Sequence, residues 1–179
     1  IHLVKYCYRY KTKIKSVGGG DSYNDIYCPK DGGILVSLEK IVKLLDVDRK
    51  KNKATFEEGM MMPELIKKLK KKNMLNSNLG TKIFECVAGS CSTSYHGSGI
   101  NYKIFSSFVK EFELITPTGE KKIVNSNDEE FAIYAVGLGV LGIITKITLQ
   151  CEKAFKLQVT EQVLSLEDIE KDFDNLLAN

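Results

Sequence analysis

Two stretches of small residues carry the chemistry that this sequence offers. The first places Gly18, Gly19 and Gly20 directly after the β-like run KTKIKSV, and the second, VAGSCSTSYHGSG, covers residues 87–99. Glycine tolerates positive φ and lets the backbone approach a ligand, so the amides of the first stretch can face an anion such as a diphosphate. The second stretch supplies amides and hydroxyls with little bulk, which suits a flat aromatic or sugar group. Two such loops, far apart in the chain, indicate one extended ligand held at both ends.

Neither stretch matches the common nucleotide-binding motifs. Tyr23 stands where the third glycine of the dinucleotide pattern G-x-G-x-x-G belongs, and no apolar-periodic helix follows it. The pattern G-x-x-x-x-G-K-[ST] is missing as well. The sequence therefore argues against a Rossmann domain and against a nucleoside triphosphatase. An ordinary solvated turn stays open as the other interpretation of the triple glycine.

Taken in order, several segments of the chain resemble the FAD-binding domain of the aldonolactone oxidase family, within the wider vanillyl-alcohol oxidase type of flavoproteins. The resemblance covers about residues 1–160, and its most specific parts are HGSG at 96–99 and GVLGIIT at 139–145. The matching segments, in chain order, are SVGGGDSYNDI, residues 32–60, PELIKKLKKKN, NLGTK, VAGSCSTSYHGSG and GVLGIITKITLQCEKAF.

The resemblance implies an α+β fold, the two-subdomain PCMH-type FAD-binding fold with mixed and antiparallel sheets flanked by helices. Residues 1–78 would form the first subdomain, without the family's first strand. Residues 79–155 would form the second, and residues 156–179 the start of a truncated cap. FAD would lie between the subdomains, with its diphosphate on the first glycine loop and its flavin ring near the second. The implied FAD contacts are Val17, Gly18, Gly19, Gly20, Asp21, Ser22, Gly80, Ala88, Gly89, Ser92, Thr93, Ser94, His96, Gly97, Ser98, Gly99 and Ile144.

Two positions depart from the family pattern. Many members carry a histidine in the first loop that bonds covalently to the flavin, and Asp21 stands at that position here. A carboxylate cannot form a histidyl link, so we expect non-covalent FAD, with Asp21 turned toward backbone amides of its own loop or toward the ring edge. Ser94 stands where the family generally has glycine, which is harmless if its φ is negative.

The function implied is that of an FAD-dependent oxidoreductase that acts on a CH–OH group of a sugar lactone or alditol, with oxygen or another electron acceptor. The family's catalytic residues lie mainly in the cap, so we assign none here and expect this fragment alone to be inactive. Two alternatives stay open. One is a flavin-fold binding or scaffold module without turnover, motivated by Asp21 and Ser94, and the other is a reductase of UDP-N-acetylenolpyruvylglucosamine.

The composition limits the classes of partner that we expect for this chain. The net charge is only +3, and the lysines within 67–72 lie on a predicted helix whose apolar residues face a core. We therefore expect a solvated lysine face and no nucleic-acid partner. The sequence contains no apolar run of about eighteen residues, so we predict no membrane-spanning helix. Five cysteines without a C-x-x-C spacing favour reduced, mostly buried thiols over a zinc site or a disulfide framework, and hence an intracellular protein over a secreted one. The oligomeric state is left open.

The remaining patterns predict alternating helices and strands. Ser165 begins the capping-box pattern S-L-E-D and opens an apolar-periodic helix. We further expect helices over 2–10 and 63–73 and over 128–136 with Ser126 or Asn127 as N-cap, and strands over 11–17, 34–38, 54–58, 108–116, 121–124, 140–150 and 156–163.

Overall fold

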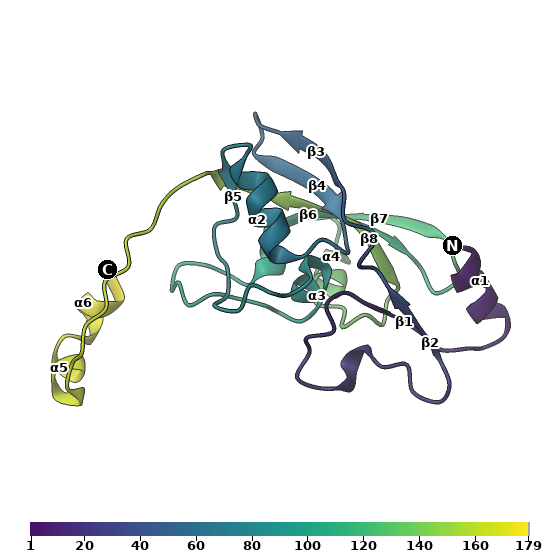
Figure 1. The fold of residues 1–179 in the computed structure, drawn as a ribbon, viewed down its shortest axis with the longest axis horizontal. Helices are drawn as coiled ribbons and strands as arrows, with labels where there is room; N and C mark the ends of the chain where they lie inside the picture. The colour runs from purple at the N-terminus through teal and green to yellow at the C-terminus, as the bar shows by residue number, and fades with distance from the viewer. Residues whose placement is uncertain (179) are drawn as a thin grey trace.

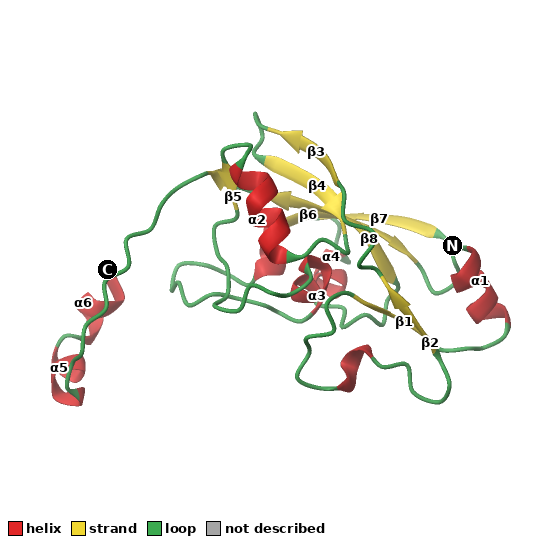
Figure 2. Ribbon diagram, in the orientation of Figure 1, coloured by secondary structure: helices red, strands yellow, loops and turns green. Residues whose placement is uncertain are grey.

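The computed structural model describes residues 1–178 and has an α+β fold (Figure 1; Figure 2). The helices are α1 (His2–Arg9), α2 (Met62–Lys70), α3 (Val87–Ser92), α4 (Phe131–Ala135), α5 (Leu166–Lys171) and α6 (Phe173–Ala178), with single 3₁₀ turns η1 (Asp25–Tyr27) and η2 (Phe105–Phe108). The strands are β1 (Ile14–Val17), β2 (Ile34–Ser37), β3 (Leu44–Asp48), β4 (Lys53–Glu57), β5 (Met74–Leu75), β6 (Val109–Ile115), β7 (Lys121–Asn125), β8 (Ile143–Gln150) and β9 (Glu152–Lys153).

A five-stranded antiparallel sheet organises the fold. Its strand order is β3-β4-β8-β6-β7, so β8 lies at the centre and pairs with β4 on one side and β6 on the other. In the β4–β8 pair the hydroxyls of Thr55 and Thr148 lie 2.9 Å apart and share a hydrogen bond, although 93 positions separate them in the chain. The β-branched segment that ends at Gln150, which was predicted to be a strand, thus forms the central strand of the sheet.

The core lies where α2 and α3 cover this sheet (Figure 2). Alternate residues of β4 point inward, so Ala54 and Phe56 are buried, as the two-residue period of a strand requires. Leu65 and Leu69 of α2 join the same cluster. The lysines at 67 and 70–72 lie on the exposed side of that segment, which agrees with the solvated face predicted from the sequence.

The first glycine loop belongs to the connection between two parallel strands. β1 and β2 pair in parallel, with Ile14 opposite Ile34. A parallel pair cannot be closed by a tight turn, because the chain has to return to the starting edge before the second strand begins. Residues 18–33 make this return, and they include the glycines and η1. The glycine loop therefore begins at the end of β1, and the rest of the connection runs back to the edge where β2 begins.

The strand pairing bears on the expected division of the chain at residue 78. β3 and β4 precede that position, but they share one sheet with β6, β7 and β8. A division that followed the sheets would fall between β2 and β3. The boundary itself stays a prediction.

Three expected elements differ from the structure. Residues 156–163 form no strand, and the helix expected over 128–136 is limited to Phe131–Ala135, with Glu130 rather than Ser126 or Asn127 as its N-cap. The side chain of Asp128 accepts a hydrogen bond from the backbone N–H of Asn125 at 2.7 Å, which stabilises a turn instead of a first helical turn. The C-terminal helix breaks at Asp172 into α5 and α6.

Other expectations are confirmed. The Ser165 hydroxyl accepts from the backbone N–H of Asp168 at 3.1 Å, so the predicted N-cap is present. α5 and α6 lie away from the rest of the molecule at the end of an extended segment (Figure 1). All five cysteines are free, and four of them are buried. The expected helices α1 and α2 and the strands β1, β2, β4, β6, β7 and β8 are present, whereas the sequence patterns did not predict β3, β5, β9 and α3.

Among the residues that the structure describes, Glu58 is the only aspartate or glutamate that is buried. Its side chain is 1% exposed, and neither carboxyl oxygen has a hydrogen-bond partner. Burial, with a smaller contribution from the charges of Glu57 and Glu113, raises its pKa to about 8. The carboxyl is therefore mainly protonated at neutral pH.

The raised pKa of Glu58 predicts a specific pH dependence of stability. The unfolded chain releases this proton near its ordinary pKa of 4.5 and the folded chain near 8, so the stabilisation is complete below 4.5 and is lost as the pH rises toward 8. In Glu58→Gln this contribution is absent. Thermal unfolding followed by circular dichroism at about pH 5 and about pH 8 should therefore show the melting temperature of the variant rising relative to wild type as the pH increases.

The matched control is Glu64→Gln. Glu64 is a solvent-accessible carboxylate that pairs with Lys68 at 3.0 Å on α2, and its melting-temperature difference from wild type should stay constant over this range. A constant difference for Glu58→Gln as well would contradict the prediction.

Candidate functional site

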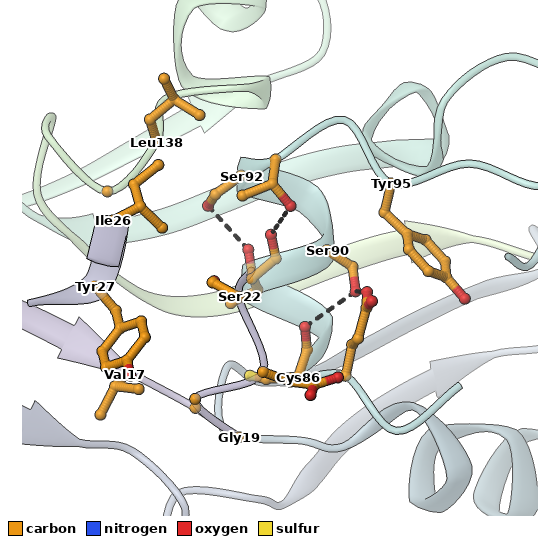
Figure 3. Close-up of a pocket in the computed structure, with 18 of the residues that line it drawn as sticks. Val17, Gly19, Ser22, Ile26, Tyr27, Cys86, Ser90, Ser92, Tyr95 and Leu138 are labelled. Carbon is orange, nitrogen blue, oxygen red and sulfur yellow. Dashed lines mark hydrogen bonds between the residues drawn. The ribbon is translucent and has the colours of Figure 1, made fainter. Parts of the chain in front are cut away.

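A cavity of about 660 Å³ lies between the first glycine loop and the α3 segment (Figure 3). Its walls come mainly from residues 15–24, 80–82, 85–86, 88–90 and 92–96, together with the segment that leads into β8. A volume of this size lies within the usual range for small-molecule and cofactor sites. The two loops that the sequence analysis singled out therefore face one common space.

The first glycine loop needs glycine for two different reasons. A Cβ on Gly18 would lie 2.3 Å from the Cβ of Cys86, so the backbone that leaves β1 can pass Cys86 only where it carries no side chain. Gly20 has a φ of +68°, in the left-handed region that other residues rarely adopt. At Gly19 the nearest atom is the mobile Cε of Met61 at 3.1 Å. The strict requirements therefore fall on Gly18 and Gly20.

The second stretch begins as a short helix rather than as an open loop. In α3 the side-chain hydroxyls bond back to the helix: Ser92 Oγ donates to the Ala88 carbonyl at 2.9 Å, and Thr93 Oγ1 donates to the Gly89 carbonyl at 2.9 Å (Figure 3). Their protons are thus used within the helix, and their lone pairs remain to accept hydrogen bonds. Nothing lies within 4 Å of the place where a Cβ on Gly89 would be, so this part of the wall offers bare backbone and open space.

Ser94 adopts the conformation that the sequence analysis identified as unfavourable. Its φ is +58°, in the left-handed region. The condition of a negative φ is thus not met. The Cβ of a serine in this region costs roughly 1–2 kcal/mol relative to the right-handed region, a cost that glycine avoids. The chain keeps the backbone shape of a glycine position with a residue that is strained in it.

Asp21 does not take the position expected from the sequence. Its carboxylate pairs with Nζ of Lys82 at 2.7 Å instead of turning to backbone amides of its own loop or to a ring edge. Lys82 also lies over the Tyr23 ring, 5.0 Å from its centroid. The hydrogen bond to Asp21 raises the pKa of Lys82, so the ammonium group of Lys82 stays charged at neutral pH. This ion pair connects the first glycine loop to the segment that follows Gly80.

Tyr95 and Cys91 support the α3 wall from behind. The Tyr95 hydroxyl donates to the Lys82 carbonyl at 2.7 Å, and its ring packs edge-on against Phe105 at 6.0 Å. Cys91 is fully buried, and burial raises the pKa of its thiol. It therefore remains a neutral thiol that fills space in the core, as expected from the sequence, and is no nucleophile.

The structure brings most of the expected FAD contacts to this cavity but leaves out three. Gly97, Ser98 and Gly99 do not line it. Gly97 packs on Asn78, whose Oδ1 would lie 2.2 Å from a Cβ at that position, so the glycine serves loop packing. The expected residues that do line the cavity are Val17, Gly18, Gly19, Gly20, Asp21, Ser22, Gly80, Ala88, Gly89, Ser92, Thr93, Ser94, His96 and Ile144.

Several cavity residues were not predicted. Leu138 and Gly139 belong to the GVLGIIT region that the resemblance had marked, so a signal for them existed. Glu58 and Cys86 carried no such signal, because only the tertiary structure places them here. The other additional lining residues are Lys15, Ser16, Tyr23, Asn24, Ile26, Tyr27, Leu38, Thr81, Lys82, Glu85 and Tyr95.

The described residues offer backbone and hydroxyl groups rather than a metal centre. No cluster of three or more histidine, cysteine, aspartate or glutamate side chains suited to a metal occurs among them. None of the described helices has the length and apolar character needed to span a bilayer. Glycine backbone borders the cavity at Gly89 and at Gly139, where nothing lies within 4 Å of an added Cβ, so a ligand in the cavity has room to contact the main chain there.

Comparison with known proteins agrees with this geometry. A family described as an FAD binding domain matches residues 1–125. L-gulonolactone oxidase of Bos taurus is 33% identical over 167 residues, which cover 92% of this chain and 38% of that protein. Mitochondrial L-galactono-1,4-lactone dehydrogenase of Brassica oleracea is 29% identical over 178 residues, which cover 98% of this chain and 29% of that protein. The chain thus spans well under half the length of these relatives.

Solved structures show the same architecture. An alkyldihydroxyacetonephosphate synthase matches with a TM-score of 0.75 and 26% identity, over 85% of this chain and 29% of that one. This similarity confirms the α+β, PCMH-type FAD-binding fold expected from the sequence. Because the family match covers more than half of its residues, the chain belongs to the family of FAD-binding domains, with aldonolactone oxidases and dehydrogenases among its relatives.

Proposed function

We propose that this chain is the FAD-binding part of a flavin-dependent oxidoreductase that acts on a CH–OH group of a sugar lactone or alditol, with oxygen or another electron acceptor. The observation that carries the proposal is the single cavity enclosed by both small-residue stretches. The names of the relatives support the substrate class, since they act on gulono-, galactono- and arabinonolactones.

The residues of the chain would bind and orient the cofactor. The backbone of Gly18 to Gly20 would hold the diphosphate, and the bare backbone at Gly89 and Gly139 would contact the flat parts of the molecule. Bound FAD supplies the ability to accept a hydride, and the protein contributes position and electrostatics. We assign no catalytic residue within residues 1–178.

We further propose that FAD binds without a covalent bond. Asp21 offers only a carboxylate, and the ion pair with Lys82 compensates its negative charge. The pair therefore reduces the repulsion that an unpaired Asp21 would exert on a diphosphate at the neighbouring glycines. A scaffold module without cofactor is the second candidate, because the left-handed Ser94 strains the wall. A purified protein that lacks yellow colour and shows no thermal shift with added FAD would favour that candidate.

The glycine loop can be tested by comparing two glycines of similar conformation. Gly20 (φ +68°) lines the cavity, whereas Gly32 (φ +72°) does not. Valine is strained equally at both, but only at Gly20 does its side chain occupy the cavity wall. Gly20→Val should lose FAD and Gly32→Val should keep it, as measured by flavin absorbance after gel filtration of samples with matched circular dichroism. Equal retention by the two variants would contradict the diphosphate loop.

The non-covalent linkage can be tested by acid precipitation of the holoprotein. A carboxylate at Asp21 is a weak nucleophile, and its ester with a flavin would hydrolyse easily. We therefore expect a yellow supernatant and a colourless pellet after centrifugation. Flavin fluorescence that stays with the polypeptide on a denaturing gel would show a covalent bond instead.

Turnover can be tested on the chain itself. Because residues 1–178 supply a cofactor wall but no acid or base assigned to the substrate, the chain loaded with FAD should produce no peroxide with gulono-, galactono- or arabinonolactone. The measurement is a coupled peroxidase assay with free FAD as the blank. Sustained lactone-dependent peroxide formation above that blank would place catalytic groups within this chain.

A further inference from the structure

Glu85 is a half-buried acid that lines the cavity and has one carboxylate oxygen to spare. Its Oε2 accepts a hydrogen bond from the Ser90 hydroxyl at 3.1 Å. Its Oε1 accepts no hydrogen bond from residues 1–178, yet unlike the oxygens of Glu58 it retains solvent-accessible surface. A ligand in the cavity can therefore reach this oxygen.

The backbone and the side chain of Glu85 are both held in place. The Glu85 carbonyl accepts a hydrogen bond from the backbone N–H of Met62, at the start of α2, at 2.9 Å. Ser90, which is 1% exposed, directs its single hydroxyl proton toward both the Glu85 carboxylate and the Cys86 carbonyl at 3.2 Å (Figure 3). A carboxylate anchored in this way loses little freedom when a ligand binds, so its free oxygen is preorganised.

Two donors lie close enough to Glu85 for its charge to act on them, but both are engaged elsewhere. The Lys82 ammonium group pairs with Asp21 at 2.7 Å, and the Tyr95 hydroxyl donates to the Lys82 carbonyl at 2.7 Å. No ion pair to Glu85 occurs in the part of the chain that the structure describes. The free oxygen of Glu85 is thus left for a donor that does not belong to these residues.

A ligand that fills the cavity displaces the water that solvates this oxygen. A carboxylate that loses its water without gaining a donor weakens binding, whereas one that receives an O–H or N–H keeps a hydrogen bond. A phosphate oxygen cannot serve, because it is itself an acceptor and carries charge of the same sign. The cavity therefore offers glycine backbone to an anion at the first glycine loop and an acceptor to a donor group at Glu85.

We propose that Glu85 is a ligand-binding residue of the cavity, and that its Oε1 accepts a hydrogen bond from a hydroxyl or N–H group of the bound ligand. The proposal rests on the proposed function, which supplies two ligands that carry such groups, FAD and a sugar-type substrate. It adds to that function a contact that selects a donor and rejects an acceptor at this point of the wall.

Two neutral substitutions separate the acceptor from the charge. Glu85→Gln and Glu85→Met both remove the carboxylate, but only glutamine keeps an acceptor oxygen. Each apoprotein, with a circular dichroism spectrum matched to that of the wild type, is titrated with FAD and followed by flavin fluorescence. If the cofactor supplies the donor, Glu85→Met should bind FAD about tenfold more weakly than Glu85→Gln. As the matched control, Glu64→Gln and Glu64→Met make the same changes outside the cavity and should bind FAD equally.

A second titration tests whether the substrate supplies the donor. The FAD-loaded variants are titrated with L-gulono-1,4-lactone, and the change in flavin absorbance reports binding without turnover. A dissociation constant for the lactone about tenfold larger in Glu85→Met than in Glu85→Gln assigns the donor to the substrate. A methionine variant that binds FAD as tightly as the glutamine variant, and shows the same response or lack of response to the lactone, would overturn the proposal. A wild type that binds no FAD would overturn the proposed function, and this inference with it.

Discussion

The antiparallel pairing of β8 with both β4 and β6 is the interaction on which the rest of the structure depends. It joins the first half of the chain to the second, since the paired hydroxyls of Thr55 and Thr148 lie 93 positions apart in the sequence. The same pairing positions the segments next to β8 and β4 that line part of the cavity. The segment before β8 brings Gly139 to the cavity, the start of β8 brings Ile144, and the residue after β4 is Glu58. Without this pairing the glycine loop would have no opposite wall.

The cavity combines a backbone suited to an anion with acidic side chains, and it handles each acid differently. Asp21, at the mouth, is compensated by the ion pair with Lys82. Glu58, in the interior, has no cation beside it and is held neutral by burial. Whether such a carboxyl group pairs with a lysine or holds a proton depends on its exposure to solvent. A solvated carboxylate keeps its charge and takes a lysine, while a buried one without a partner takes a proton.

Much of the fold and of the site could be predicted from local patterns. The alternation in β4, the lysine-covered face of α2 and the glycines after β1 each express a physical preference within a few residues. The family resemblance then placed two distant stretches around one ligand, and the structure brings most of those residues together.

What could not be predicted depends on contacts between distant segments. The pairing of Asp21 with Lys82 and the burial of Glu58 follow from tertiary structure alone. The left-handed φ of Ser94 is unusual for a serine, so propensity argued against it. The strand expected over 156–163 is missing because its apolar residues, exposed in the structure, find no neighbouring strand.

The central place of β8 also has a consequence for how the chain folds during synthesis. β3 and β4 can form a local hairpin as soon as they are made, but the second partner of β4 follows only around residues 146–150. An isolated two-stranded hairpin is marginally stable in water, so Phe56 would remain exposed until residues 146–150 have left the ribosome. Closing such distant contacts is slow, because the entropy of the intervening chain has to be lost first. The apolar strands of the nascent chain are therefore open to association with other chains for longer than those of a sheet built from local hairpins.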